Sequence, residues 1–213
     1  MANDSSIVRA VLDQVKSDGR SALTAPEAKK VCDAYGIPLP SEGLATSSAD
    51  AASVADGIGY PVVMKIVSAD ILHKTEAVDV KIGVASAEEA TAAYDEIIAN
   101  AKSYKADADV AGVQVQQMLP SDGQEVIVGA VTDPSFGKLV AFGLGGILVE
   151  VLKDITFRLA PAKKDQALSM LESIDAAEVL NGIRGADPVN KNAIADIITN
   201  VSNLISEFPE IQE

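Results

Sequence analysis

The chain is poor in the residues that build covalent scaffolds and aromatic cores. Its 213 residues include one cysteine, one histidine and no tryptophan, and aromatic residues make up only 4%. A single cysteine excludes a disulfide framework within the chain and is compatible with a reducing compartment, so we expect a cytoplasmic protein. The apolar residues are mainly Ala, Val, Ile and Leu, which suits helices packed on sheets better than an all-β sandwich. We therefore expect an α/β fold.

Positive charge is also scarce. Lys and Arg number 17 against 31 Asp and Glu, which gives a net charge of -14. Such a field repels phosphate backbones, so the composition argues against a nucleic-acid partner. A local group of cations and amides can still hold the phosphate of a small nucleotide. Charges interrupt the apolar residues of the first 20 positions, so we expect neither a signal peptide nor a membrane span there.

Helical and strand patterns alternate through the first half of the chain. Apolar residues at helical spacing predict an N-terminal helix that stops near Gly19. Capping-box spacing at Thr24/Glu27 and at Ser86/Glu89 predicts helices over 25–35 and from 86 to about 102. Between these lie a short helix predicted over 48–57, a buried strand over 61–67 (PVVMKIV) and a short strand over 80–84.

The second half is rich in strands before helices return from residue 163 onward. Predicted strands cover 113–118, 125–131, 138–142 and 148–152, separated by SDG, DPSFG and GLGG turns. We expect these strands to form one antiparallel unit. The predicted organisation is an N-terminal helix (1–20), a small α/β lobe (21–110) and a larger lobe (111–213) of antiparallel strands backed by helices.

Four features carry candidate chemistry, each with a simpler structural reading. Lys65 alternates with apolar residues inside a strand, so its ammonium must either extend to an edge or meet an anion. The GLGG segment could let the backbone approach a phosphate, or could be only a turn. Gln116, Gln117 and Glu125 could read an adenine edge and a ribose, or could be solvated strand ends. His73 lies in a polar loop, where an ordinary surface histidine is the alternative.

Several separated motifs carry a family resemblance when taken in order. They are EAKKVCDAYGIPLP, GYPVVMKIVSADILHKTE, EVIVGAVTDPSFGKLVAFGLGGILVEVLKDITFRLAP and the final EFPEI. The chain resembles, from about residue 23 to 213, the ATP-grasp domain or β subunit of the NDP-forming acyl-CoA synthetases. This group contains ADP-forming acetyl-CoA synthetase and, more distantly, the β subunit of succinyl-CoA synthetase.

The resemblance implies a reversible reaction that converts acyl-CoA, ADP and phosphate into a carboxylic acid, CoA and ATP. It also implies a partner, an α subunit with CoA-binding and phosphohistidine domains, through which the chain meets acyl-CoA. In this family a histidine of the α subunit takes the phosphoryl group, and a second histidine in an HK motif of the β subunit passes it to the nucleotide. That second histidine corresponds to His73, and a neutral imidazole has the nucleophilicity that such a relay needs.

The resemblance also assigns roles in binding ATP or ADP. Lys65 matches a lysine that contacts nucleotide phosphates, and residues 115–118, with Gln116, Gln117 and Met118, match the hinge that pairs with adenine. Glu125 matches an acid on the ribose side. Lys81 lies either in the same cleft or on an ordinary strand surface, and Arg158 is a further candidate for anion contact.

Two departures from the family pattern leave other functions open. Val78 and Asp79 stand where the family has a glycine pair, which stiffens the loop and adds negative charge. The sequence reaches Glu213 without the acid-x-Asn-Pro motif that holds Mg²⁺ in the family, so we expect an incomplete magnesium site, to which Glu150 could contribute. The alternatives are a catalytically degenerate ATP-grasp domain that serves as a structural or regulatory partner, and an ATP-grasp carboxylate ligase of another kind, which would not need His73.

Overall fold

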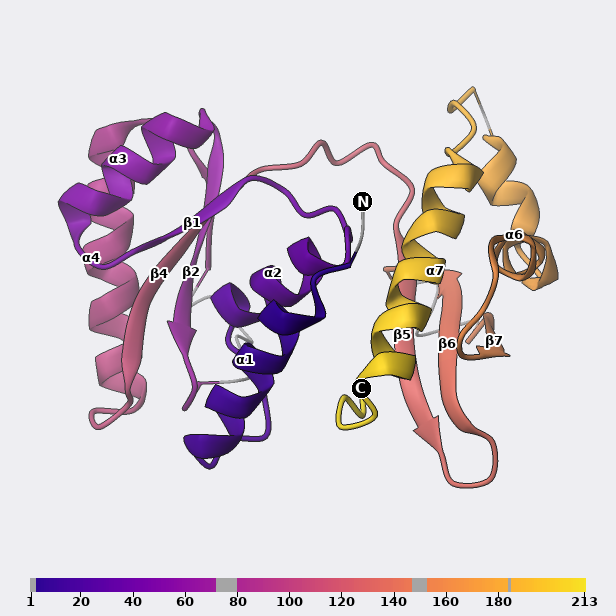
Figure 1. Cartoon of the computed structure of the whole chain (residues 1–213). Helices are drawn as coiled ribbons and strands as arrows, with labels where there is room; N and C mark the ends of the chain where they lie inside the picture. The colour runs from indigo at the N-terminus through magenta and orange to yellow at the C-terminus, as the bar shows by residue number, and fades with distance from the viewer. Residues whose placement is uncertain (1–2, 72–79, 147–152, 184) are drawn as a thin grey trace. The chain divides into compact units, whose positions relative to one another are not determined.

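The chain folds into two compact units. The structure, a computed structural model, describes residues 3–71, 80–146, 153–183 and 185–213. What we call the first unit comprises Asp4–Ala34 and Leu39–Pro120, and the second unit comprises Tyr35–Pro38 and Ser121–Glu213 together with Asn3. Each unit is built around its own antiparallel sheet (Figure 1).

The first unit contains a four-stranded sheet with one face covered by helices. Its strand order is β1-β4-β2-β3, and every neighbouring pair is antiparallel. Helices α3 and α4 pack against each other and against the sheet (Figure 1). The elements are β1 (Glu42–Ala45), α3 (Ser48–Ile58), β2 (Val62–Ser68), β3 (Val80–Val84), α4 (Ala87–Tyr104) and β4 (Val110–Gln117).

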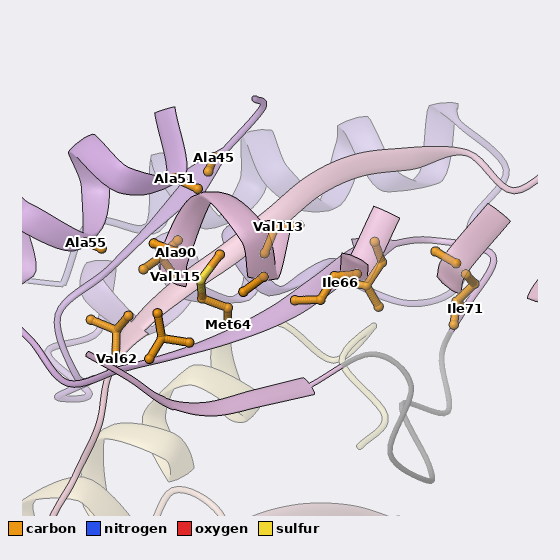
Figure 2. Close-up of a cluster of buried hydrophobic side chains, with 14 residues drawn as sticks. Ala45, Ala51, Ala55, Val62, Met64, Ile66, Ile71, Ala90, Val113 and Val115 are labelled. Carbon is orange, nitrogen blue, oxygen red and sulfur yellow. The ribbon is translucent and has the colours of Figure 1, made fainter. Parts of the chain in front are cut away.

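The core of this unit lies between the sheet and the two helices. Val62, Met64 and Ile66 alternate along β2 and are fully buried. Figure 2 shows Met64 and Val115, from neighbouring strands, in one cluster with Ala90 of α4. Because side chains alternate across a strand, the residues between these on β2 point to the other face of the sheet.

Helices α1 (Ser5–Ser17) and α2 (Ala25–Ala34) form an N-terminal pair. Arg20, in the turn between them, makes a two-pronged ion pair with Glu27, with N–O distances of 2.9 and 2.7 Å. Glu27 also accepts from the backbone N–H of Thr24 at 2.7 Å, which is the bond expected from the capping-box spacing. Arg20, followed by the Thr24 contacts, lowers the pKa of Glu27 to about 2.

The second unit backs a three-stranded sheet with helices. The strand order is β5-β6-β7, and both pairs are antiparallel. Helix α7 packs across β5 and β6, while α6 packs on α7 and β7. The elements are β5 (Val126–Asp133), β6 (Gly137–Leu144), β7 (Ile155–Leu159), α6 (Lys164–Ser173), the short 3₁₀ helix η1 (Ala177–Asn181) and α7 (Lys191–Glu207). Within the described ranges, every helix is too short or too polar to span a lipid bilayer.

The α/β class and most expected elements are confirmed, but the strands form two antiparallel sheets rather than the single antiparallel unit expected. Strand β4 pairs with β1 and β2, so it belongs to the first unit, and the chain leaves that unit after Pro120 rather than near residue 110. Strands β1 and β7 were not predicted from the sequence. The strand expected over 148–152 lies outside the described residues.

The Arg20–Glu27 pair predicts a specific dependence of stability on pH. A carboxylate whose folded-state pKa is lowered stabilises the fold above its unfolded pKa, and this contribution is lost as pH falls through the folded value of about 2. The difference in unfolding free energy between wild type and Glu27→Gln should therefore be largest near neutral pH. It should shrink below about pH 4.5 and vanish near pH 2, as measured by urea denaturation.

The matched control is Asp33→Asn, which removes an exposed i,i+4 ion pair with Lys29 at 2.6 Å. Such surface pairs contribute little, so this variant should track wild type at every pH. A Glu27→Gln difference that stays constant from pH 7 to pH 2 would contradict the assignment.

Candidate functional site

Lys65 lies on the side of the first sheet that faces away from α3 and α4. It is half-buried in β2, an interior strand, between the fully buried Met64 and Ile66. Its Nζ donates to Oε1 of Gln116 on β4 at 3.1 Å. An ammonium in an interior strand needs such an acceptor, because an unpaired buried charge is costly. The ammonium is therefore held in place by a neutral amide.

Glu42 fixes the other end of the same amide. The Gln116 Nε2 donates to Oε2 of Glu42, in β1, at 2.6 Å. A lysine can only donate and an ionised glutamate can only accept, so the two partners together determine which way the Gln116 amide points. Three neighbouring strands thus supply one continuous hydrogen-bonded row, Glu42–Gln116–Lys65. Glu42 was not among the predicted site residues, and its segment SEGLA carries no pattern that distinguishes it from a solvated acid.

Gln114 lies on the same side of the sheet and directly opposite Lys65. The two are backbone partners in the β2–β4 register, and side chains of paired residues share a face. Gln114 is only 3% exposed, and its Oε1 has no hydrogen-bond partner among the described residues. Strand alternation in VQVQQ puts residues 114 and 116 on one face, so this pattern could have identified Gln114, whereas the sequence analysis chose the adjacent pair 116 and 117.

The end of β4 uses its backbone amides to hold neighbouring segments. The N–H of Gln117 donates to the carbonyl of Ser41 at 2.8 Å, and that of Met118 donates to the carbonyl of Pro61 at 3.4 Å. The Gln117 side chain is exposed, and Met118 presents an apolar surface that is 36% exposed. This exposed apolar end follows directly from the strand that carries Gln114 and Gln116.

Lys81 lies on the opposite side of the sheet from Lys65. It is the register partner of Met64, whose side chain is in the core, and its Nζ pairs with Glu96 of α4 at 2.6 Å. The face that carries Lys81 is therefore the one that the helices cover. Of the sequence-predicted residues in the first unit, the structure brings Lys65 and Gln116 together and directs Lys81 elsewhere.

Glu125 belongs to the second unit, just before β5. Its carbonyl accepts from the N–H of Gly145 at 2.8 Å, and the GLGG turn packs closely on it. A Cβ added to Gly146, which has φ of +61°, would lie 2.6 Å from Glu125 Oε2. A glycine at position 146 is therefore favoured for structural reasons, since a larger residue would displace the Glu125 side chain. Arg158 donates to Thr156 Oγ1 at 3.2 Å and to Ser173 Oγ at 3.1 Å, both within its own unit.

His73, Val78, Asp79 and Glu150 lie outside the described residues. Hydrogen bonds and strand pairing hold the described residues on either side of 72–79. Ser68 Oγ donates to the carbonyl of Asp109 at 2.6 Å, and Asp109 N–H donates to Asp70 Oδ2 at 2.7 Å. This Asp109 bond, followed by the Lys105 ion pair, lowers the pKa of Asp70. On the far side, Val80 pairs with Lys65 itself.

The described ranges contain no group of three or more His, Cys, Asp or Glu side chains arranged to hold a metal ion. The polar row in the first unit holds one carboxylate, Glu42, and that carboxylate is already engaged by Gln116.

Comparison with known proteins gives consistent matches over nearly the whole chain. A family model described as "ATP-grasp domain" matches residues 14–213. The subunit beta of acetate--CoA ligase [ADP-forming] I from Pyrococcus furiosus is 49% identical over 205 residues, which cover 96% of this chain and 88% of the relative.

Two solved structures from Ca. Korarchaeum cryptofilum, both of dinucleotide forming acetyl-coenzyme A synthetase 1, resemble the chain closely. One, in complex with coenzyme A, Ca-AMPCP and HgCl+, gives a TM-score of 0.89 at 40% identity and covers 94% of this chain and 87% of that one. The other, with coenzyme A and Mg-AMPPCP, has its phosphohistidine segment pointing towards the nucleotide binding site. It gives a TM-score of 0.81 at 36% identity over 94% of this chain and 86% of that one.

The unpartnered amide oxygen of Gln114 predicts that its removal stabilises the fold. A buried polar atom without a partner costs about 1–3 kcal/mol, and methionine has nearly the shape of glutamine. Gln114→Met should therefore raise the free energy of unfolding by about 1 kcal/mol, measured by urea denaturation. Gln116→Met is the control, because its amide is bonded at both ends and its loss should lower stability. A less stable Gln114→Met protein would show that this oxygen is satisfied in solution.

Proposed function

The chain belongs to the ATP-grasp domain family, and we propose that it is the nucleotide-binding β subunit of an ADP-forming acyl-CoA synthetase. With its partner it would interconvert acyl-CoA, ADP and phosphate with a carboxylic acid, CoA and ATP. The resemblance to such β subunits is confirmed by the near full-length match to the Pyrococcus subunit. The proposal depends on one observation: the Lys65 ammonium is held by a neutral amide on the side of the sheet away from the helices.

Lys65 has the properties required of a phosphate ligand. Within the described residues its ammonium donates to Gln116 alone, so two of its three N–H donors are left for an anion there. A direct carboxylate partner would cancel its positive charge, as Glu96 does for Lys81. Charge-assisted bonds to phosphate oxygens are stronger than neutral hydrogen bonds. We assign Lys65 to the phosphates of ADP or ATP.

The end of β4 supports the base of the nucleotide. Gln116 and Gln117 end β4, and Met118, which follows the strand, adds an exposed apolar surface on which a flat base can pack. Glu125 is assigned to the ribose hydroxyls, for which a carboxylate is a good acceptor. Lys81, although predicted as a nucleotide ligand, is not assigned to the nucleotide here, since it is engaged by Glu96 on the helical side.

His73 is the proposed phosphoryl carrier of this chain. In the direction of ATP synthesis, the N–P bond of a phosphohistidine on the partner breaks as an imidazole nitrogen of His73 attacks the phosphorus. A terminal oxygen of the ADP β-phosphate then attacks the same phosphorus, the His73 nitrogen leaves, and ATP forms. The segment that carries His73 starts after the anchored Ile71 and ends at Val80, the register partner of Lys65.

The partner is proposed to be an α subunit that binds CoA and the acyl group. The Pyrococcus relative is named as subunit beta, which implies a second subunit in that enzyme. Mg²⁺ accompanies the nucleotide in one of the solved relatives. In general this ion retains several waters and is bound through substrate phosphates and one or two carboxylates, and it would neutralise phosphate charge.

A degenerate ATP-grasp domain is the second candidate, favoured by Val78 and Asp79 in place of the family's glycine pair. Such a domain would keep the fold and the partner but would not transfer phosphoryl groups. An ATP-grasp ligase of another kind would bind nucleotide without needing His73. The two experiments below separate these functions.

Lys65→Met should weaken ADP binding by about 1.5–3 kcal/mol, the range for losing a charge-assisted hydrogen bond, which is roughly a ten- to hundredfold rise in Kd. Isothermal titration calorimetry provides the measurement. Lys81→Met is the matched control, a strand lysine of the same sheet on the other face, and its Kd should stay near that of wild type. Equal ADP affinity in wild type and Lys65→Met would remove Lys65 from the site.

His73→Asn should abolish acyl-CoA-dependent ATP formation by the chain and its α subunit, while leaving ADP affinity almost unchanged. The reason is that asparagine has no nucleophilic nitrogen for the relay. Phosphorylation of His73 should appear only when the α subunit and substrates are present, as measured by acid-labile radiolabel from labelled phosphate. Full turnover by His73→Asn would eliminate the relay and favour another kind of ligase, whereas no turnover by wild type would favour the degenerate domain.

A further inference from the structure

Two amide side chains of β4 lie on the Lys65 side of the sheet, and one of them binds the Lys65 ammonium. Gln114 and Gln116 lie two residues apart on one side of the strand, and both carry an amide oxygen on the Lys65 side of the sheet. Lys65 Nζ bonds Gln116 at 3.1 Å, while the Gln114 oxygen has no partner in the described part of the chain. Sites two residues apart on a strand differ by about 6–7 Å along it, so the choice of acceptor decides where the charge lies.

Glu42 biases this choice. Its carboxylate accepts from Gln116 Nε2 at 2.6 Å, so the amide presents its oxygen, and not its NH₂ group, to Lys65. If the amide rotated by half a turn, two donors would face each other at Lys65 and two acceptors at Glu42. Both ends of the row therefore favour one orientation. Without Glu42, only the lysine would restrain the Gln116 amide, while Gln114, the register partner of Lys65, carries a second amide oxygen on the same face.

We propose that Glu42 is a positioning residue, which acts through Gln116 to hold the Lys65 ammonium at the place where nucleotide phosphate binds. The proposal rests on the proposed role of Lys65 in nucleotide binding. An amide between the two charges serves this purpose, because it transmits orientation while keeping the carboxylate from pairing with the ammonium directly. Glu42 would thus tune the affinity for a nucleoside diphosphate or triphosphate without touching the ligand.

A double-mutant cycle on the full chain tests this role. The proteins are wild type, Glu42→Met, Lys65→Met and the double variant, with Kd for ADP measured by calorimetry. Glu42→Met should raise Kd about three- to tenfold when Lys65 is present and leave it unchanged in the Lys65→Met background. Glu42→Gln, which retains an acceptor for Gln116, should recover most of the affinity. Glu96→Gln, which removes the carboxylate bound by Lys81 on the other face, should leave Kd at the wild-type value.

Three outcomes would overturn the inference. An equal loss of affinity from Glu42→Met in both backgrounds would mean that Glu42 acts on the fold and not through Lys65. Unchanged or tighter ADP binding by Glu42→Met would mean that the negative charge of Glu42 opposes ADP binding at least as much as its orientation of the Gln116 amide favours it. No recovery by Glu42→Gln would mean that hydrogen-bond acceptance is not its role.

A ligand-free readout separates this inference from the proposed function. The Lys65 ammonium signal in a ¹⁵N-lysine NMR spectrum, assigned by its loss in Lys65→Met, should be protected from solvent exchange in wild type and broadened in Glu42→Met. If Lys65→Met leaves Kd unchanged, the assignment of Lys65 to the phosphates fails. The ammonium signal would still decide whether Glu42 positions Lys65, and an identical signal in Glu42→Met would refute the positioning role itself.

Discussion

An ammonium group in an interior strand of a sheet must keep hydrogen bonds when it leaves water, and the candidate site follows from this constraint. Lys65 lies between two fully buried residues of β2, so it cannot share their face. Strand alternation directs it to the side opposite α3 and α4, and Gln116 supplies its acceptor. The same alternation sends Lys81 to the helical side, where Glu96 neutralises it. The two lysines therefore lie on opposite faces of one sheet. Lys65 lies on the face proposed to bind nucleotide, and Lys81 lies on the face where it joins the sheet to α4.

Much of the fold could be predicted because local signals and packing agree. Thr24/Glu27 and Ser86/Glu89 mark helix starts through side-chain bonds that the structure contains, and PVVMKIV is a buried strand as its composition indicates. Strand β1 has only four residues, with a glycine among them, and pairs solely with the distant β4, so its formation depends on tertiary contacts that local patterns do not report. The grouping of β4 with the later strands was wrong for the same reason, since its partners lie far earlier in the chain.

Site residues could be predicted where an unusual residue type in the sequence also matches the family pattern. They could not be predicted where only the pairing of distant strands brings side chains together. Lys65 was predicted because a charge interrupts an apolar strand. Gln116 was predicted because it lies near the end of a strand that precedes Glu125 in the sequence. Glu42 was missed because only the β1–β4 register places it in the row with Lys65, whereas Gln114 was missed although strand alternation in VQVQQ places it on one face with Gln116. Roles for His73 came from the resemblance alone, and they stay a prediction, as do those of Gln117, Met118 and Glu125.

We propose that nucleotide binds on the Lys65 side of the first sheet, and chemical-shift mapping can locate the bound nucleotide residue by residue. Backbone amide spectra of ¹⁵N-labelled chain would be recorded during a titration with ADP. We expect saturable shifts concentrated at β2 around Lys65 and at the end of β4, with little change along α3 and α4. Saturable shifts confined to the helical face, or no saturable shifts at millimolar ADP, would contradict this proposal.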